Sequence, residues 1–125
     1  MSFDFNNQLD ITFEASADLS ADQYRFVTVD TNGQIALATR GALAIGVLQD
    51  KPAAQGRAGC VRTVSGAVTK IVLGGSVTKG QAIVSDANAK AVNASSADNA
   101  FMGFALEGGS AGQIIAMLLQ PRGLS

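Results

Sequence analysis

The side chains most able to do chemistry are scattered along this chain rather than gathered in one motif. There is no histidine, so nucleophile pairs that need an imidazole base cannot form. The single cysteine, Cys60, excludes an intramolecular disulfide, and no histidine is present to share a metal with it. The two glutamates, Glu14 and Glu107, lie far apart, and most of the eight aspartates fall in expected turns. We therefore predict that the protein is not an enzyme and has no catalytic residues, no metal and no cofactor.

Two kinds of short motif could bind ions, and neither is complete. Asp30 with Asn32, and Asp86 with Asn88, offer oxygen ligands, but Asp-x-Asn turns commonly close hairpins by bonding to their own backbone. Calcium needs more ligands than either turn supplies. Residues 108–112, GGSAG, resemble a phosphate-binding loop only in their glycines, since no Lys-Ser/Thr pair or helix follows. The sequence therefore favours turns over ion sites.

The overall composition limits the classes of partner. The chain has 125 residues, enough for one domain, and only 15% are charged, below the roughly 25% typical of soluble domains. A surface so poor in charge indicates that other chains cover part of it. The net charge of -1 provides no basic patch for nucleic acid or an anionic membrane, so we expect neither as a partner. Without an apolar run of about 20 residues or a signal peptide, we expect the protein to be made and kept in the cytosol.

The residues that could take part in chemistry are expected to be positioned by β-strands. Residues 66–92 read as three strands separated by glycine and Asp-x-Asn turns. Much of this segment occurs earlier in the chain, because residues 19–32 resemble residues 77–88, residues 44–48 resemble 101–105, and residues 59–61 resemble 112–114. We predict an all-β fold with little helix, a small antiparallel β-barrel or barrel-like sandwich built as an internal pseudo-repeat.

Three finer expectations concern individual strands. Residues 60–64 and 68–73 are expected to form a hairpin around Ser65-Gly66. Residues 113–119 form a continuous apolar run, which predicts a closing strand buried on both faces. Cys60, next to Val61, is expected to be a buried structural thiol.

The N-terminus shows an alternation of apolar and polar residues that only Asn7 breaks. Apolar side chains stand at odd positions, and the candidate partner-binding residues are Phe3, Phe5, Leu9, Ile11 and Phe13. An extended arm that adds to a neighbour's sheet would use this pattern. The alternative is an ordinary first strand of the domain itself. We predict an extended arm over residues 1–15, followed by a single β domain over residues 16–125.

One resemblance covers about a quarter of the chain. The segment GAVTKIVLGGSVTKGQAIV is similar to the half-barrel of biotinyl and lipoyl carrier domains, in which a lysine at a hairpin tip carries the prosthetic group. Lys90 is the nearest candidate here. Its neighbours, Ala89 and Ala91, depart from the family's Met-Lys-Met or Asp-Lys-Ala setting, and Asp86-Ala87-Asn88 would form the tip instead.

A second resemblance extends from Leu19 to Gln120. It rests on the order of three segments: AIGV at residues 44–47, VTKGQAIVSD at residues 77–86, and MGFALE at residues 102–107 leading into a glycine loop. In this order the chain resembles the capsid cement or head decoration proteins of tailed bacteriophages, a family first defined as a domain of unknown function. It departs from the family at Asp22, where glycine is usual, and at Val84-Ser85, where an aromatic residue is usual.

This second resemblance implies a structural protein of the virion. Such a protein would bind the capsid exterior as a homotrimer and cement neighbouring subunits of the major capsid protein. Two alternatives stay open: a carrier domain modified on Lys90, and a small ligand-binding β-barrel or enzyme.

Overall fold

The computed structural model describes residues 9–63, 65–95 and 100–123. In these residues the chain forms ten strands and no helix, so the predicted all-β class is confirmed. The strands are β1 (Asp10–Glu14), β2 (Phe26–Val29), β3 (Ile35–Leu37), β4 (Gly46–Leu48), β5 (Ala58–Arg62), β6 (Ala67–Val72), β7 (Ala82–Ser85), β8 (Ala91–Asn93), β9 (Ala100–Ala105) and β10 (Ile114–Gly123).

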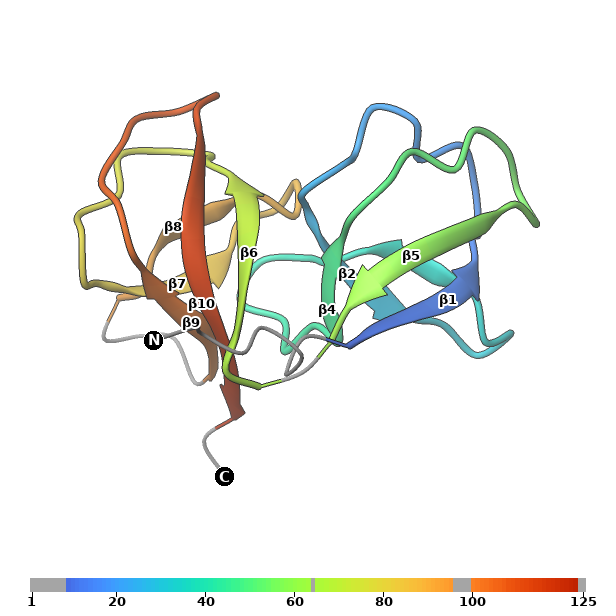
Figure 1. The fold of residues 1–125 in the computed structure, drawn as a ribbon, viewed down its shortest axis with the longest axis horizontal. Helices are drawn as coiled ribbons and strands as arrows, with labels where there is room; N and C mark the ends of the chain where they lie inside the picture. The colour runs from blue at the N-terminus through green and yellow to red at the C-terminus, as the bar shows by residue number, and fades with distance from the viewer. Residues whose placement is uncertain (1–8, 64, 96–99, 124–125) are drawn as a thin grey trace, which may run out of the picture.

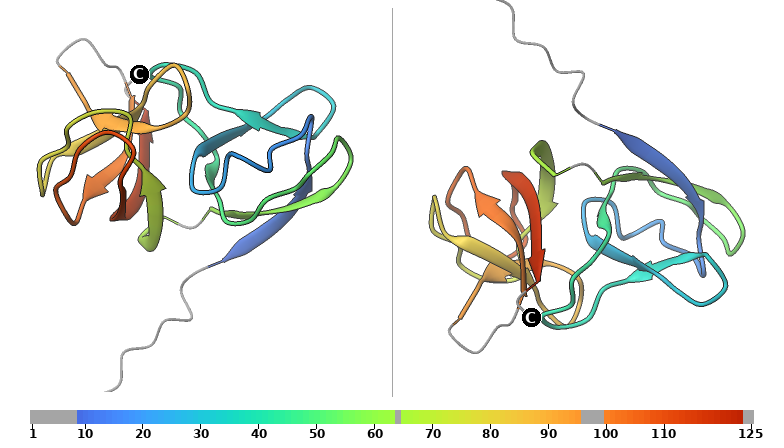
Figure 2. Two further views of the ribbon diagram at one scale, coloured as in Figure 1. Left: turned by 90° about the horizontal axis from the view of Figure 1, so that it is seen from above. Right: turned by 90° about the horizontal axis from the view of Figure 1, so that it is seen from below.

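The strands form two antiparallel sheets with the same internal order. The first sheet has the order β1-β5-β4-β2-β3 and the second has β6-β10-β9-β7-β8, so each strand of the second sheet takes the place of its counterpart in the first. We call β1 to β5 the N-terminal unit and β6 to β10 the C-terminal unit. The two units lie side by side (Figures 1 and 2). The predicted pseudo-repeat is confirmed, and because the described strands close no barrel, the barrel-like sandwich is the alternative that fits.

Strand register fixes which residues are equivalent in the two units. Phe26 lies opposite Val47, and Ala82 lies opposite Phe104 at the same place in the second sheet. The hairpin turns match as well, because the side-chain Oδ1 atoms of Asp30 and Asp86 each accept two backbone N–H bonds within their own turn. These turns were predicted from their Asp-x-Asn sequence.

The third segment of the predicted repeat was aligned in the wrong register. Val61 lies opposite Leu48, while Met117 lies opposite Ala105. Met117, and not Ile114, is therefore the counterpart of Val61. The error arose because Gly59 was matched with Gly112, although Gly59 lies within β5 and Gly112 lies before β10.

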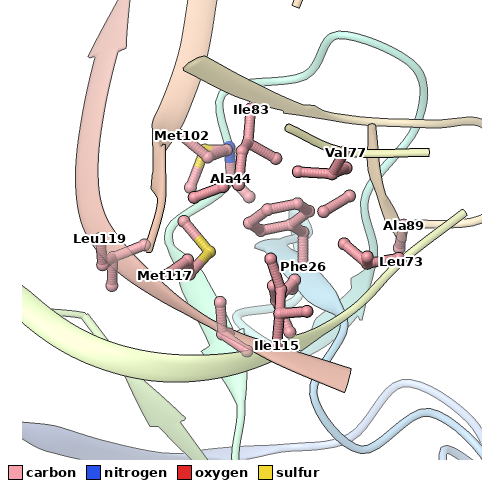
Figure 3. Packing of buried hydrophobic residues seen from close by; sticks show 14 of the residues in the cluster. Phe26, Ala44, Leu73, Val77, Ile83, Ala89, Met102, Ile115, Met117 and Leu119 are labelled. Carbon is pink, nitrogen blue, oxygen red and sulfur yellow. The ribbon is translucent and has the colours of Figure 1, made fainter. Parts of the chain in front are cut away.

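Two hydrophobic cores hold the molecule together. The smaller lies within the N-terminal unit and contains Ala15, Leu19, Val27, Ile35, Leu48 and Val61. The larger combines the C-terminal unit's inward side chains with Phe26, Ala38, Ala44 and Val47 of the N-terminal unit. Phe26 sits in its middle, surrounded by Leu73, Val77, Ile83, Ala89, Ile115 and Met117 (Figure 3). β2 therefore has a core on each of its two faces: Val27 packs into the smaller core and Phe26 into the larger one.

Hydrogen bonds also join the two units. The backbone N–H of Phe26 donates to the carbonyl of Ala89, and that of Val72 donates to the carbonyl of Tyr24, both at 2.9 Å. Gln49 Nε2 donates to Thr69 Oγ1 at 2.8 Å. Shared burial and these bonds make the two units one packed body.

Two strand predictions were wrong. The expected hairpin between residues 60–64 and 68–73 does not form, because β5 already pairs with β1 and β4 on its two edges, and β6 joins the other sheet. The run at residues 113–119 is not buried on both faces. Ile115, Met117 and Leu119 face the larger core, whereas Ile114 is 52% exposed on the opposite face.

Candidate functional site

The groups that could have bound an ion are instead hydrogen-bonded within the protein. In the loop at residues 108–112, the N–H of Gly109 donates to the Val77 carbonyl and that of Gly112 to the Leu73 carbonyl. The N–H of Ser110 donates to Gln113 Oε1 at 2.8 Å. These donors are directed into the protein and do not form an anion cradle. In the described part of the chain, no group of three or more His, Cys, Asp or Glu side chains is arranged so that it could hold a metal ion.

Cys60 is half-buried, so the expectation of a buried thiol was wrong. It lies on β5 opposite Thr12 and next to Val61, which faces the smaller core, so the Cys60 side chain is on the other, outward face of the sheet. Burial raises the pKa of the Cys60 thiol, and the negative charges of Asp10 and Asp50 raise it further. A raised pKa leaves little thiolate at neutral pH, which is the opposite of what a reactive cysteine needs.

Lys90 does not occupy a hairpin tip. The turn between β7 and β8 has Ala87 and Asn88 at its end, and Lys90 follows it immediately before β8. Its backbone N–H donates to Asp86 Oδ1 at 2.9 Å. The position of a carrier lysine is therefore not reproduced here.

The predicted partner-binding residues fall into two groups. Phe3 and Phe5 lie outside the described residues. Leu9, Ile11 and Phe13 share one face along or just before β1, which pairs with β5 and is the edge strand of its sheet. Phe13 is half-buried against the smaller core, Ile11 is 39% exposed and Leu9 is 53% exposed. Residues 10–14 thus belong to the domain's own sheet. The side chains on their apolar face become more exposed from Phe13 toward the N-terminus.

An ion pair fixes the start of β1. Arg62 Nε donates to Asp10 Oδ1 at 2.9 Å and Arg62 Nη2 to Asp10 Oδ2 at 3.1 Å, a bidentate arrangement. The hydrogen bonds from Arg62 lower the pKa of the Asp10 carboxyl below its ordinary value. Arg62 Nη1 also donates to the carbonyl of Val68 at 3.1 Å, so the same side chain links β1 to the C-terminal unit.

A second apolar surface was missed in the sequence. Four side chains stand directly opposite one another across β6, β10, β9 and β7, and we call them the outer row: Val68, Leu118, Phe104 and Ala82. Val68 is 45% exposed and the other three are half-buried. Phe101 contacts Phe104 edge to face, with ring centroids 5.8 Å apart, and Leu106 nearby is 39% exposed. The sequence of β6 provided no clear signal of this surface, because its buried positions (Ala67, Thr69, Ile71) and its exposed positions (Val68, Lys70) each include both apolar and polar residues, and the assumption of a doubly buried β10 concealed it further.

Comparisons with known proteins identify a family and a similar fold. A family model described as phage cement protein matches residues 4–119. Among solved structures, the chain is similar to the head fiber gp8.5 N base in bacteriophage phi29, with a TM-score of 0.74 and 16% identity, covering 94% of this chain and 98% of that chain. At this identity the likeness concerns the fold alone. No curated protein sequence matches the chain. None of the described residues forms a helix long and apolar enough to cross a membrane.

Proposed function

Because the chain belongs to the phage cement protein family, and is thus a structural component of the phage capsid, we propose that it binds the outside of the assembled shell and ties neighbouring major capsid protein subunits together. The observation that carries this proposal is the exposed apolar face of β1. Leu9 and Ile11 are exposed on an edge strand, where a partner can reach both the side chains and the free side of the strand. Exposed apolar surface of this kind is typical of interaction sites.

Residues 1–15 are proposed to act together in this binding. Phe3 and Phe5 continue the alternation of Leu9, Ile11 and Phe13 in the sequence, so an extended segment would present all five side chains on one face. Their partner is either the major capsid protein or a sister copy within a homotrimer. Low surface charge and an apolar composition support self-association, since buried interfaces are poor in charged residues.

The test is to add purified protein to closed capsid shells that lack it and to measure co-sedimentation. Binding to closed shells demonstrates exterior attachment, and intact protein that does not sediment with them would refute the function. Substituting Phe3 and Phe5 together by alanine is expected to weaken binding by about 2–4 kcal/mol per arm, because aromatic anchors commonly dominate an interface. The control is Ile114→Ala, an exposed apolar residue at 52% on the C-terminal unit.

The double variant also distinguishes the two partners. Loss of shell binding by an oligomer of unchanged mass identifies the capsid protein as the arm's partner, whereas dissociation of the oligomer identifies a sister copy. If both properties are unchanged and the melting temperature is that of the parent protein, the aromatic residues of the arm have no part in the mechanism.

A further inference from the structure

Three apolar side chains of the N-terminal unit are exposed at positions whose equivalents in the C-terminal unit are buried. Register makes Leu9 equivalent to Ala67, Ile11 to Thr69 and Val29 to Ser85. The exposed fractions are 53%, 39% and 39% for Leu9, Ile11 and Val29, against 1%, 3% and 0% for their equivalents Ala67, Thr69 and Ser85. The same location in the repeat is therefore covered in one unit and open in the other.

The cover over the C-terminal positions comes from the N-terminal unit of the same chain. Gln49 Nε2 donates to Thr69 Oγ1 at 2.8 Å, and the N–H of Gly41 donates to the Ser85 carbonyl at 2.9 Å. Phe26 and Val47, on the same side of β2 and β4, enter the larger core. One face of the N-terminal unit thus packs against residues of β6 and β7 in the C-terminal unit.

The equivalent face of the C-terminal unit has no cover in the described structure. Phe104 takes the place of Val47 but is only half-buried, whereas Val47 is 0% exposed. Leu106 takes the place of Gln49, because each donates its N–H to the carbonyl of an equivalent residue, Ala116 and Cys60 respectively. Leu106 is 39% exposed. One chain therefore presents both surfaces, or halves, of a second contact between units: the exposed N-terminal surface around Ile11 and the exposed C-terminal surface around Leu106.

The side chains of these two halves are matched in polarity. Inside the chain, Gln49 meets Thr69 through a hydrogen bond; the equivalent pair is Leu106 and Ile11, both apolar. A polar pair in the internal contact is thus replaced by an apolar pair in the second contact.

We propose that the C-terminal unit of one copy packs against the N-terminal unit of the next, with Leu106 on Ile11, in the arrangement that the two units adopt within a chain. The occupant of each open surface is a second copy of this protein, joined head to tail. Such a heterologous contact closes into a ring when its rotation permits, and three copies would alternate six units around it. The inference rests on the self-association proposed above: of the two partners named there for the face of Leu9 and Ile11, it selects the sister copy, and its test needs no capsid shells.

The test compares oligomer mass by light scattering for Leu106→Asp, Ile11→Asp and the control Ile114→Asp. A buried carboxylate without a partner is unfavourable, so each of the first two variants is expected to fall to the mass of one chain. Ile114 is 52% exposed, and its equivalent Ala58 is exposed too, so it lies outside the inferred contact and Ile114→Asp should keep the parent mass. Unchanged melting of the dissociated chain, checked by circular dichroism, excludes misfolding.

Mixing the two defective variants gives the decisive result. Leu106→Asp retains a working N-terminal surface and Ile11→Asp retains a working C-terminal surface, so the mixture is expected to form a one-to-one heterodimer that grows no further. A symmetric contact, in which the same patch meets itself, would not produce this species. Parent protein that stays monomeric at its highest soluble concentration, or variants that keep the parent mass, would overturn the proposal.

A cross-linking experiment covers the case in which a charged variant fails to fold. In a Cys60→Ala background, Ile11→Cys combined with Leu106→Cys is expected to give disulfide-linked oligomers under mild oxidation, because disulfides form only between nearby Cβ atoms. Ile11→Cys combined with Ile114→Cys is the matched control and should remain one chain on a denaturing gel. Equal cross-linking of both pairs would contradict the inferred geometry.

Discussion

Replacement of Phe26 by alanine should show how strongly the two units depend on one another. Phe26 belongs to β2 of the N-terminal unit, yet its ring is 0% exposed within the larger core. Burying an aromatic side chain removes about 150–250 Å² from water, which at about 25 cal/mol per Å² gives an upper value of about 4–6 kcal/mol. Phe→Ala substitutions in cores cost about 3–5 kcal/mol, so we expect a loss in this range.

The assay is urea denaturation followed by tryptophan-independent probes, since the chain has no tryptophan: far-UV circular dichroism and the fluorescence of Tyr24. The matched control is Phe104→Ala, measured at concentrations where the chain is monomeric. Phe104 is half-buried on the outer row, so the same deletion should cost less than half as much. Equal losses in the two variants, or a loss below about 1 kcal/mol for Phe26→Ala, would refute the role of Phe26 as the connection between the units.

Three further substitutions test local features of the fold. A methyl group on Gly103 would meet the Leu118 carbonyl oxygen, so Gly103→Ala should lower the free energy of unfolding in urea by about 1–3 kcal/mol or prevent folding. Asp86→Ala removes the acceptor of two turn N–H bonds and should cost about 0.5–2 kcal/mol in the same assay, with oligomer mass unchanged. Asp10 has a lowered pKa through Arg62, so the pair stabilises the fold above the ordinary aspartate pKa and the contribution disappears as pH falls through the lowered value. Asp10→Asn should therefore flatten the acid limb of a melting-temperature profile and cost under about 1 kcal/mol at neutral pH; an unchanged acid limb would argue against the pair.

Much of the fold could be predicted because its signals are local. The side chains of Asp30 and Asp86 accept hydrogen bonds from the backbone two and four residues further on. A turn of this kind can be predicted from a few consecutive residues. The repeat was visible for the same reason, since its matching segments are turns and the strands beside them. The order of strands in each sheet was not local information and became clear only from the structure.

The failures have one physical origin, which is that a strand's sequence does not state which neighbour it joins. Residues 60–64 and 68–73 have a glycine turn between them, yet pairing with β1 and β4 occupies both edges of β5. The equivalence of β1 and β6 was invisible as well. Their sequences, DITFE and AVTKIV, share no motif, and only register shows that Ile11 and Thr69 hold the same place.

That equivalence reverses the usual relation between burial and polarity. The buried positions of the C-terminal unit carry Thr69 and Ser85, whereas the exposed equivalents in the N-terminal unit carry the more apolar Ile11 and Val29. Within an isolated chain this distribution is unfavourable at the exposed places, because aliphatic surface gains nothing from contact with water, whereas a buried hydroxyl is tolerated when it has a hydrogen-bond partner. Thr69 has its partner in Gln49 of the same chain. Ile11 gains burial only from another chain that presents Leu106. Head-to-tail assembly therefore explains both replacements of a polar residue by an apolar one: Ile11 at the position equivalent to Thr69, and Leu106 at the position equivalent to Gln49.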